Sequence, residues 1–193
     1  MRILIIDGHP DPRPQRFLHA LARAYREGAE AARHEVKTIA VGAMDIPLLR
    51  TAEDFQNGKP SASIEEAQQK IIWADHLLIL FPLWLGAMPA VLKAFFEQTL
   101  RPGFAFAEAK KGRLPKKLLR GKTSRIVVTM GMPGFFYRFY LRAHSLKSLE
   151  KNVLAFCGIK PVGSSVIGMI EGMSAKQRAN WLARMAALGR KAR

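Results

Sequence analysis

The chain is poor in cysteine, in acidic residues and in long apolar runs. Cys157 is the one cysteine among 193 residues, which excludes a framework of intramolecular disulfides. The apolar run over residues 77–85 is far too short to cross a bilayer. No signal peptide is recognisable at the start of the sequence. We therefore expect a soluble, cytoplasmic protein.

Several motifs that mark common sites are also missing. The sequence has no Cys-x-x-Cys pair, no His-x-x-x-His spacing and no cluster of carboxylates, so we expect no metal site. It has no Gly-x-Ser-x-Gly motif of a hydrolase. The first predicted turn lacks Gly-x-Gly-x-x-Gly, which argues against the Rossmann grip on a resident dinucleotide.

Positive charge is in large excess. Thirty-one Lys and Arg against 15 Asp and Glu leave a formal charge of +16, which must attract anions. Nucleotide and flavin phosphates, acidic lipid and nucleic acid are all candidates, and scattered surface charge that only maintains solubility is an equal alternative. A nucleic-acid binder should carry a recognisable reading motif, and none is present. The basic segment Lys110 to Lys117 is predicted to be an exposed loop that touches membrane, a partner or solvent.

Hydrophobic periodicity alternates between strand-like and helix-like segments along the whole chain. This alternation predicts one α/β domain over residues 1–193, a doubly wound parallel sheet with helices on both faces. Ser63 is predicted to cap the second helix, with Glu66 at the capping-box spacing. Residues 44–60 and 101–122 are predicted to be loops. The predicted strands are 3–6, 35–40, 75–81, 123–129 and 162–168, and the predicted helices are 16–32, 63–73, 89–100, 142–157 and 174–189.

The turn after the first strand has the features of an anion site. It opens a helix, whose N-terminus offers free N–H groups and a positive dipole to a phosphate. His9 and Arg16 add side-chain donors, Phe17 follows them, and Gly8 lets the backbone turn. A Pro-rich turn with an incidental histidine is the alternative reading.

A second candidate site follows the third predicted strand. Pro82, Leu83, Trp84 and Leu85 stand at its carboxyl end, where open parallel sheets bind ligands, and they would pack against a flat aromatic ring. Ordinary core packing of Trp84 is the alternative.

The fourth predicted strand ends in a third candidate site. Thr129, Met130, Gly131 and Pro133 are small or stiff enough to let the backbone approach a ligand closely. The aromatic run from Phe135 to Tyr140 after them is typical of an oligomer interface or a pocket wall.

Taken together, these motifs resemble one family. The segment Phe81-Pro82-Leu83-Trp84 through Glu97, with Gly8-His9-Pro10, Pro102 to Phe106 and Thr129-Met130-Gly131, is similar to the NAD(P)H:quinone oxidoreductases of the flavodoxin-like fold, the DT-diaphorase family. The resemblance implies a three-layer sandwich with a five-stranded parallel sheet, and FMN as cofactor with FAD as the alternative. It also implies NAD(P)H as a substrate, ping-pong hydride transfer to a quinone-like acceptor, and a homodimer with each site built from both chains.

The resemblance assigns roles to the candidate residues. His9 and the residues that open the first helix, Arg16 and Phe17, would hold the flavin phosphate. The backbone of Leu83, Trp84 and Leu85 would line the isoalloxazine edge. The segment from Thr129 to Pro133, with Met130 and Gly131, would meet the pyrimidine side of the ring.

Two catalytic residues follow from the same resemblance, and three positions depart from the family pattern. Tyr137 would lie over the substrate pocket, and His144 would balance charge during hydride transfer. A structural role for both residues is the alternative. Gln15, Leu18 and Met132 stand where relatives commonly have Ser, Asn and Gly. These departures leave open whether flavin binding is retained. A regulatory flavoprotein subunit of a membrane transport system is therefore the alternative function.

Overall fold

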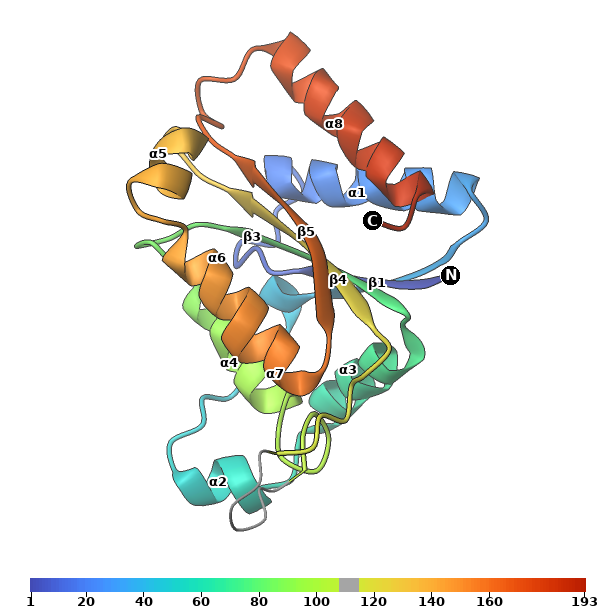
Figure 1. Ribbon diagram of the computed structural model, residues 1–193, viewed down its shortest axis with the longest axis vertical. Helices are drawn as coiled ribbons and strands as arrows, with labels where there is room; N and C mark the ends of the chain where they lie inside the picture. The colour runs from blue at the N-terminus through green and yellow to red at the C-terminus, as the bar shows by residue number, and fades with distance from the viewer. Residues whose placement is uncertain (108–114) are drawn as a thin grey trace.

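A five-stranded parallel sheet organises the computed structural model, which describes residues 1–107 and 115–193 (Figure 1). The strand order is β2-β1-β3-β4-β5, and every neighbouring pair is parallel. This order confirms the predicted flavodoxin-like α/β fold. The strands are β1 (Arg2–Asp7), β2 (Glu35–Ala40), β3 (His76–Pro82), β4 (Thr123–Thr129) and β5 (Lys160–Ile167).

The two strands at the centre of the sheet are almost wholly apolar because helices cover both faces. All seven residues of β3 are buried, and in β1 only Arg2 is exposed. The edge strand β2 instead alternates between exposed and covered residues. A continuous apolar run thus identifies the central strands directly in the sequence.

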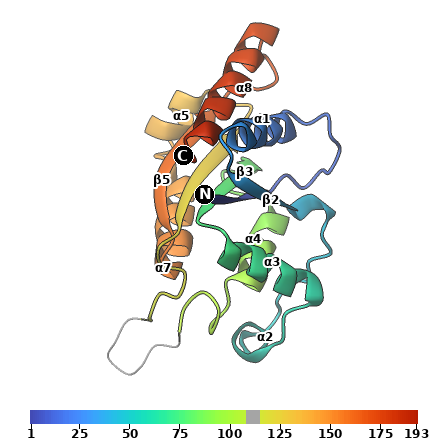
Figure 2. The ribbon, with the colours of Figure 1, turned by 90° about the vertical axis from the view of Figure 1, so that its right-hand side faces the viewer.

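Helices form a layer on each side of the sheet (Figures 1 and 2). Two helices cover one face and enclose a core with Ile3, Ile5 and Leu80. The other helices cover a larger core that contains Leu4, Ile6 and Ile79. The first pair is α1 (Phe17–Ala31) and α8 (Ala175–Arg190), and the other layer contains α3 (Ala62–Trp73), α4 (Ala90–Thr99), α6 (His144–Ser148), the π-helical η2 (Leu149–Leu154) and α7 (Ala155–Cys157). Within the described ranges, no helix is both long and apolar enough to cross a membrane.

Helix boundaries differ from the prediction where side chains did not make the expected caps. Helix α3 begins one residue before Ser63, with Ser61 at the N-cap and no side-chain cap bond, so the predicted Ser63–Glu66 capping box is wrong. Ser63 Oγ lies 3.1 Å from Ser61 Oγ instead. The predicted helix over residues 142–157 begins only at His144, because Ala143 before it is left-handed with φ 48°.

Three short elements occur outside the predicted strands and helices. The first is a 3₁₀ turn, η1 (Val41–Ala43). Helix α2 (Ala52–Asn57) is capped by Thr51, whose hydroxyl accepts from the amide of Asp54. Helix α5 (Gly134–Phe139) is built from the aromatic run itself.

The predicted exposed loop over residues 101–122 is partly interior. Arg101, Ala105 and Leu119 are buried, because the segment packs under the amino edge of the sheet. Lys117 is exposed, with its Nζ 2.6 Å from the carbonyl oxygen of Ala155. Residues 110–114 of the predicted basic loop lie outside the described residues.

Candidate active site

The chain reverses its winding direction between β1 and β3, which are neighbours in the sheet. Open α/β sheets bind ligands in the crevice at such a point, beyond the carboxyl ends of the strands. A cavity of about 520 Å³ opens there. Six predicted residues line it, together with six others that were not singled out as ligand contacts. The first set is His9, Arg16, Phe17, Pro82, Trp84 and Thr129, and the second is Asp11, Gln15, Leu18, Ile170, Glu171 and Arg178.

The N-terminus of α1 opens into this cavity without an internal cap. Arg16 is its N-cap residue, makes no side-chain cap bond, and no acidic residue occupies the first turn. The amides of Phe17 and Leu18 donate to no backbone carbonyl of the described chain. A 15-residue helix with free N–H groups and no acidic residue in its first turn is suited to an external anion.

His9 presents a hydrogen-bond donor to the same cavity. Its Nδ1 accepts from the amide of Asp11 at 3.0 Å, so in the neutral ring the proton resides on Nε2. Partial burial lowers the pKa of His9, and the nearby His19 lowers it further, which favours the neutral ring. The ring centroid lies 6.5 Å from that of Trp84, nearly perpendicular to it. His9 is thus positioned to donate Nε2–H to a phosphate or ring oxygen.

A partly buried pair behind His9, His19 with Asp7, fixes this loop, and sequence reasoning missed it. His19 Nδ1 lies 2.5 Å from Asp7 Oδ2, and His19 Nε2 lies 3.0 Å from the carbonyl oxygen of Asp11. The other oxygen of Asp7 accepts from the amide of His9 at 3.1 Å. The imidazole of His19 therefore bridges the carboxylate of Asp7 and the carbonyl of Asp11. The signal in the sequence was Asp7 itself, a carboxylate at the end of a buried strand that requires a partner.

Arg16 does not lie as predicted. Its Nε donates to Asp11 Oδ2 at 2.7 Å, and Arg13 Nη2 donates to the same oxygen at 2.6 Å. The Arg13 hydrogen bonds hold the pKa of Asp11 well below its usual range. Arg16 lines the cavity, but its guanidinium is held by Asp11, so the phosphate contact predicted for its side chain requires that ion pair to open.

The loop after β3 is a tight two-residue turn. Trp84 and Ala87 exchange backbone hydrogen bonds of 2.9 Å in both directions, with Leu85 at φ 46° and Gly86 at φ 77°. These angles are those of a type I′ turn. The turn leaves Trp84 52% exposed beside the cavity and directs the Leu85 side chain fully into solvent.

This turn corrects the prediction that three consecutive backbone amides face a ring. The amide of Leu83 donates to the carbonyl of Thr129 at 2.7 Å, and that of Trp84 donates within the turn. Only Leu85, of the three predicted residues, has an amide without a backbone acceptor among the described residues.

The end of β4 is split between the cavity and the core. Thr129 is buried and lines the cavity. Met130 is buried in the core, and its amide donates to Ile167 at 2.9 Å, so it has no group free for a ligand. Gly131 is exposed, and a Cβ there would lie 3.6 Å from the carboxylate of Glu171. Pro133 caps α5 and does not line the cavity.

The structure also corrects the placement of Tyr137. Its side chain is 1% exposed, and its hydroxyl lies 2.8 Å from Ser145 Oγ and accepts from the amide of Leu146 at 3.2 Å. These contacts tie α5 to α6 and leave no hydroxyl over a substrate pocket. His144 is exposed at the start of α6 and lies outside the cavity lining.

A cation–aromatic pair closes the far end of the cavity. The guanidinium carbon of Arg178 lies 4.8 Å from the centroid of the Phe17 ring, and Arg178 Nη2 donates to the carbonyl of Ile170 at 2.6 Å. Arg178 therefore adds a fixed positive charge next to the α1 N-terminus. It is about 160 residues from Phe17 in sequence, and no local pattern indicates it.

Comparisons with known proteins agree with this fold. A family model described as flavodoxin-like fold matches residues 1–188. The chain is 28% identical over 149 residues to mouse ribosyldihydronicotinamide dehydrogenase [quinone], with 71% of this chain and 62% of that protein covered. It is 32% identical over 130 residues to FMN-dependent NADH:quinone oxidoreductase 1 of Idiomarina loihiensis, with 67% and 65% covered.

A solved structure has the same fold. NAD(P)H:quinone oxidoreductase from Methanothermobacter marburgensis superposes with a TM-score of 0.80 at 21% identity, covering 99% of this chain and 96% of that one. The chain spans about three fifths of the first two curated relatives that it matches, 58% and 62% of their lengths. The predicted resemblance to quinone oxidoreductases is confirmed, and the chain belongs to the family of proteins with the flavodoxin-like fold.

Proposed function

We propose that this protein is an NAD(P)H-dependent flavin oxidoreductase that reduces quinones or similar flat acceptors. One observation carries the proposal: the uncapped N-terminus of α1, His9 and the exposed ring of Trp84 share one cavity of about 520 Å³ at the β1/β3 switch point. The cavity therefore offers a surface to each end of a flavin mononucleotide: the α1 N-terminus and His9 to the phosphate, and the Trp84 ring to the flat ring system. Similarity to a ribosyldihydronicotinamide dehydrogenase [quinone] and to an FMN-dependent NADH:quinone oxidoreductase supports the same function.

FMN is the proposed cofactor. The amides of Phe17 and Leu18 and the Nε2–H of His9 would hold its phosphate, and the Thr129 side of the cavity would take the ring edge. FAD stays the alternative, because the cavity continues past the α1 N-terminus to Glu171 and Arg178. Gln15 and Leu18 both line the cavity, so the departures from the family pattern change its chemistry without closing it.

The residues of the site position groups rather than transfer protons. A bound flavin would supply the hydride chemistry, taking a hydride from NAD(P)H and passing it to the acceptor after the nicotinamide has left. His9 and the α1 N-terminus fix the phosphate, which anchors the ring. Trp84 offers an aromatic surface that excludes water from one side of the cavity. His144 is proposed to face the acceptor from its exposed position, and Tyr137 to hold α6, and with it His144, in place.

A second copy of the chain is proposed to complete the site. Phe135, Phe139 and Tyr140 on and after α5 are 68%, 79% and 74% exposed, a concentration of aromatic surface that is unusual for a monomer. The segment follows directly from the β4 end of the cavity. A homodimer that covers it would bring a second chain to the acceptor side of the ring.

The test is a redox cycle under anaerobic conditions. The protein is loaded with FMN or FAD, desalted, reduced with NADH or NADPH, and then mixed with a benzoquinone while the flavin absorbance is followed. Retained flavin that bleaches and recovers supports the proposal. If the protein retains flavin but neither nucleotide reduces it, the regulatory alternative is favoured. A pull-down of membrane proteins with the purified protein would then test that alternative.

A further inference from the structure

The face of the sheet that α1 and α8 cover carries a half-buried arginine without an acidic partner. Arg125 lies on β4, opposite Leu78 of β3 and Gly163 of the edge strand β5. Leu78 belongs to the core under α1 and α8, so Arg125 projects from the same face. Among the residues that the structure describes, Arg125 forms no ion pair. A guanidinium held partly away from water is costly unless an anion or several acceptors compensate it.

Few acceptors are available to this guanidinium. Its Nη1 donates to Ser165 Oγ over a long distance of 3.3 Å. Its Nε is buried and bonds to no atom of the described chain. The guanidinium lies over Gly163, where a Cβ would stand 2.6 Å from Nη2. The absence of a side chain at Gly163 therefore makes the space that Arg125 uses at the edge of the sheet.

Two neutral side chains near Arg125 also have polar atoms without a partner. Tyr25 and His76 are fully buried, and neither the hydroxyl of Tyr25 nor Nε2 of His76 bonds to any group of the described chain. The other ring nitrogen of His76 lies 2.7 Å from Thr123 Oγ1. Burial raises the pKa of Tyr25 and lowers the pKa of His76 to about 4, and the guanidinium of Arg125 lowers both. Both side chains are therefore neutral at pH 7, and the phenol can donate a hydrogen bond.

The other charges close to Arg125 are positive. Burial lowers the pKa of Arg125, and the nearby Arg184 and Arg193 lower it further. Both of these arginines are exposed, and the guanidinium carbon of Arg184 lies 5.0 Å from the centroid of the Trp181 ring. Residues 172–193 contain six Lys and Arg and no Asp or Glu. A group of three guanidiniums in such surroundings attracts an anion from outside the chain.

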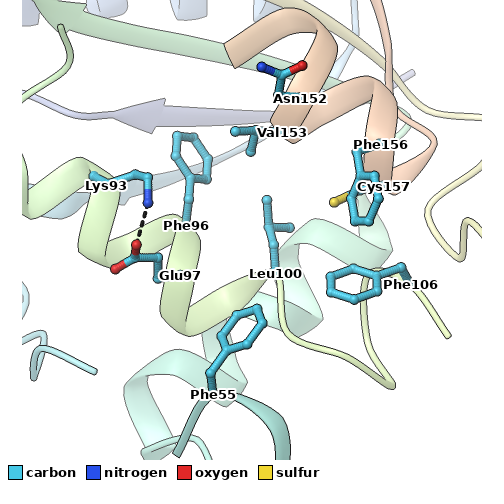
Figure 3. Close-up of a pocket in the computed structure, with 10 residues that line it drawn as sticks. All are labelled: Phe55, Lys93, Phe96, Glu97, Leu100, Phe106, Asn152, Val153, Phe156 and Cys157. Atoms are coloured by element: carbon cyan, nitrogen blue, oxygen red, sulfur yellow. Dashed lines mark hydrogen bonds and ion pairs between the residues drawn. The ribbon is translucent and has the colours of Figure 1, made fainter. Parts of the chain in front are cut away.

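Elsewhere in the described chain, comparable cations are satisfied internally. Arg101 is 6% exposed, and its guanidinium donates to three backbone carbonyls and to one side-chain oxygen. Lys93, beside the apolar pocket on the opposite face of the sheet, forms an ion pair with Glu97 (Figure 3). Arg125 has neither kind of compensation, which distinguishes it from a structural arginine.

We propose that Arg125, with Tyr25 and Arg184, binds one phosphate-type oxyanion at the β5 edge of the sheet. The Nε–H of Arg125 and the hydroxyl of Tyr25 have no other acceptor in the described chain, and they would donate to oxygens of the anion. Planar guanidinium groups match phosphate oxygens in pairs, so a phosphate is favoured over a halide. None of these residues lines the flavin cavity, and the site stands independently of the proposed oxidoreductase function.

The test follows the binding of inorganic phosphate to FMN-saturated protein, in which the α1 N-terminus is already filled. The ¹⁵Nε–¹H signal of Arg125, assigned by its loss in Arg125→Met, should shift along a single-site saturation curve. Chloride at the same ionic strength should shift this signal much less. If the protein does not retain FMN, the same signal is followed without flavin, so failure of the proposed function leaves this test intact.

Two variants separate a built site from general attraction. Gly163→Ala keeps every charge but displaces the guanidinium of Arg125, and it should raise the phosphate dissociation constant about tenfold, which corresponds to the loss of one hydrogen bond to a charged group. Arg184→Gln removes one charge at the site and should also weaken binding. Lys176→Gln removes one charge two turns away on α8, is the matched control, and should bind phosphate as wild type does.

Circular dichroism establishes that the variants are folded. If Gly163→Ala does not fold, the comparison of Arg184→Gln with Lys176→Gln decides, because both substitutions are at exposed positions. An Arg125 signal that does not respond to phosphate would overturn the proposal. Equal affinity of wild type and Gly163→Ala, equal losses in Arg184→Gln and Lys176→Gln, or an equal response to chloride would also overturn it.

Discussion

The partly buried pair of His19 and Asp7 behind the proposed phosphate loop gives a quantitative prediction. His19→Ala removes the hydrogen bond to Asp7 and the bond to the carbonyl of Asp11. A bond to a charged group contributes about 1.5–3 kcal/mol and a neutral one about 0.5–1.5 kcal/mol, so the free energy of unfolding should fall by about 2–4 kcal/mol. Asp7 is also left buried without its partner, which places the effect toward the upper end of this range.

The same substitution should weaken FMN binding, because the loop of His9 is then no longer fixed. Ordering one residue on binding costs about 1–2 kcal/mol, so the dissociation constant of FMN should rise about tenfold. Quenching of flavin fluorescence measures this constant, and urea unfolding measures stability. Riboflavin, which lacks the phosphate, should be affected less than FMN.

A matched control is available at the far edge of the fold. His34 also makes two hydrogen bonds, to the N-terminal nitrogen at 3.1 Å and to the carbonyl of Arg190 at 3.2 Å, but both are exposed. His34→Ala should leave the FMN dissociation constant unchanged. Equal FMN affinity in wild type and His19→Ala would refute the positioning role of His19.

Three further predictions concern stability and the ring surface. Burial lowers the pKa of His76 to about 4, so as the pH falls the unfolded chain binds a proton at His76 before the folded chain does. The free energy of unfolding should therefore fall by about 3 kcal/mol between pH 6.5 and 4. Urea unfolding of His76→Gln should lack this loss, and equal pH dependence of wild type and His76→Gln would refute the role of His76. A Cβ at Gly189 would lie 2.0 Å from the carbonyl oxygen of Tyr25, so Gly189→Ala should lower the free energy of unfolding by about 1–3 kcal/mol. Gly172→Ala is the control, because a Cβ at Gly172 would have no atom within 4 Å, and it should leave stability unchanged. Equal free energies of unfolding for Gly189→Ala and wild type would argue against close packing of α1 on α8. Trp84→Ala should remove about 0.5–1.5 kcal/mol of ring contact and raise the FMN dissociation constant roughly two- to tenfold in a fluorescence titration, and an unchanged constant would place the ring elsewhere.

The strands were predictable because burial on both faces leaves a simple pattern. The continuous apolar run of β3 identified a central strand, and its carboxyl end located the site. The capping prediction at Ser63 failed because two serines compete there, and local spacing does not decide which of them precedes the helix. Helix α2 was missed because its stability depends on a local cap and on distant contacts from Arg101.

The site itself was only partly predictable. His9 and Trp84 follow strand ends, so the topology alone brings them together. The ion pair of Arg16 with Asp11, and the contact of Arg178 with Phe17, depend on side-chain geometry that no spacing encodes. The backbone amides after β3 were misjudged because that of Leu83 donates to β4 and that of Trp84 is used within the type I′ turn.

Backbone amide chemical shifts can test directly whether the flavin phosphate binds at the α1 N-terminus. FMN and riboflavin are added in turn to ¹⁵N-labelled protein, and the backbone resonances of Phe17 and Leu18 are compared. Both amides should shift strongly with FMN and little with riboflavin, because only FMN places a phosphate at the α1 N-terminus. Equal responses to the two ligands, or FMN shifts confined to other residues, would contradict the proposed site.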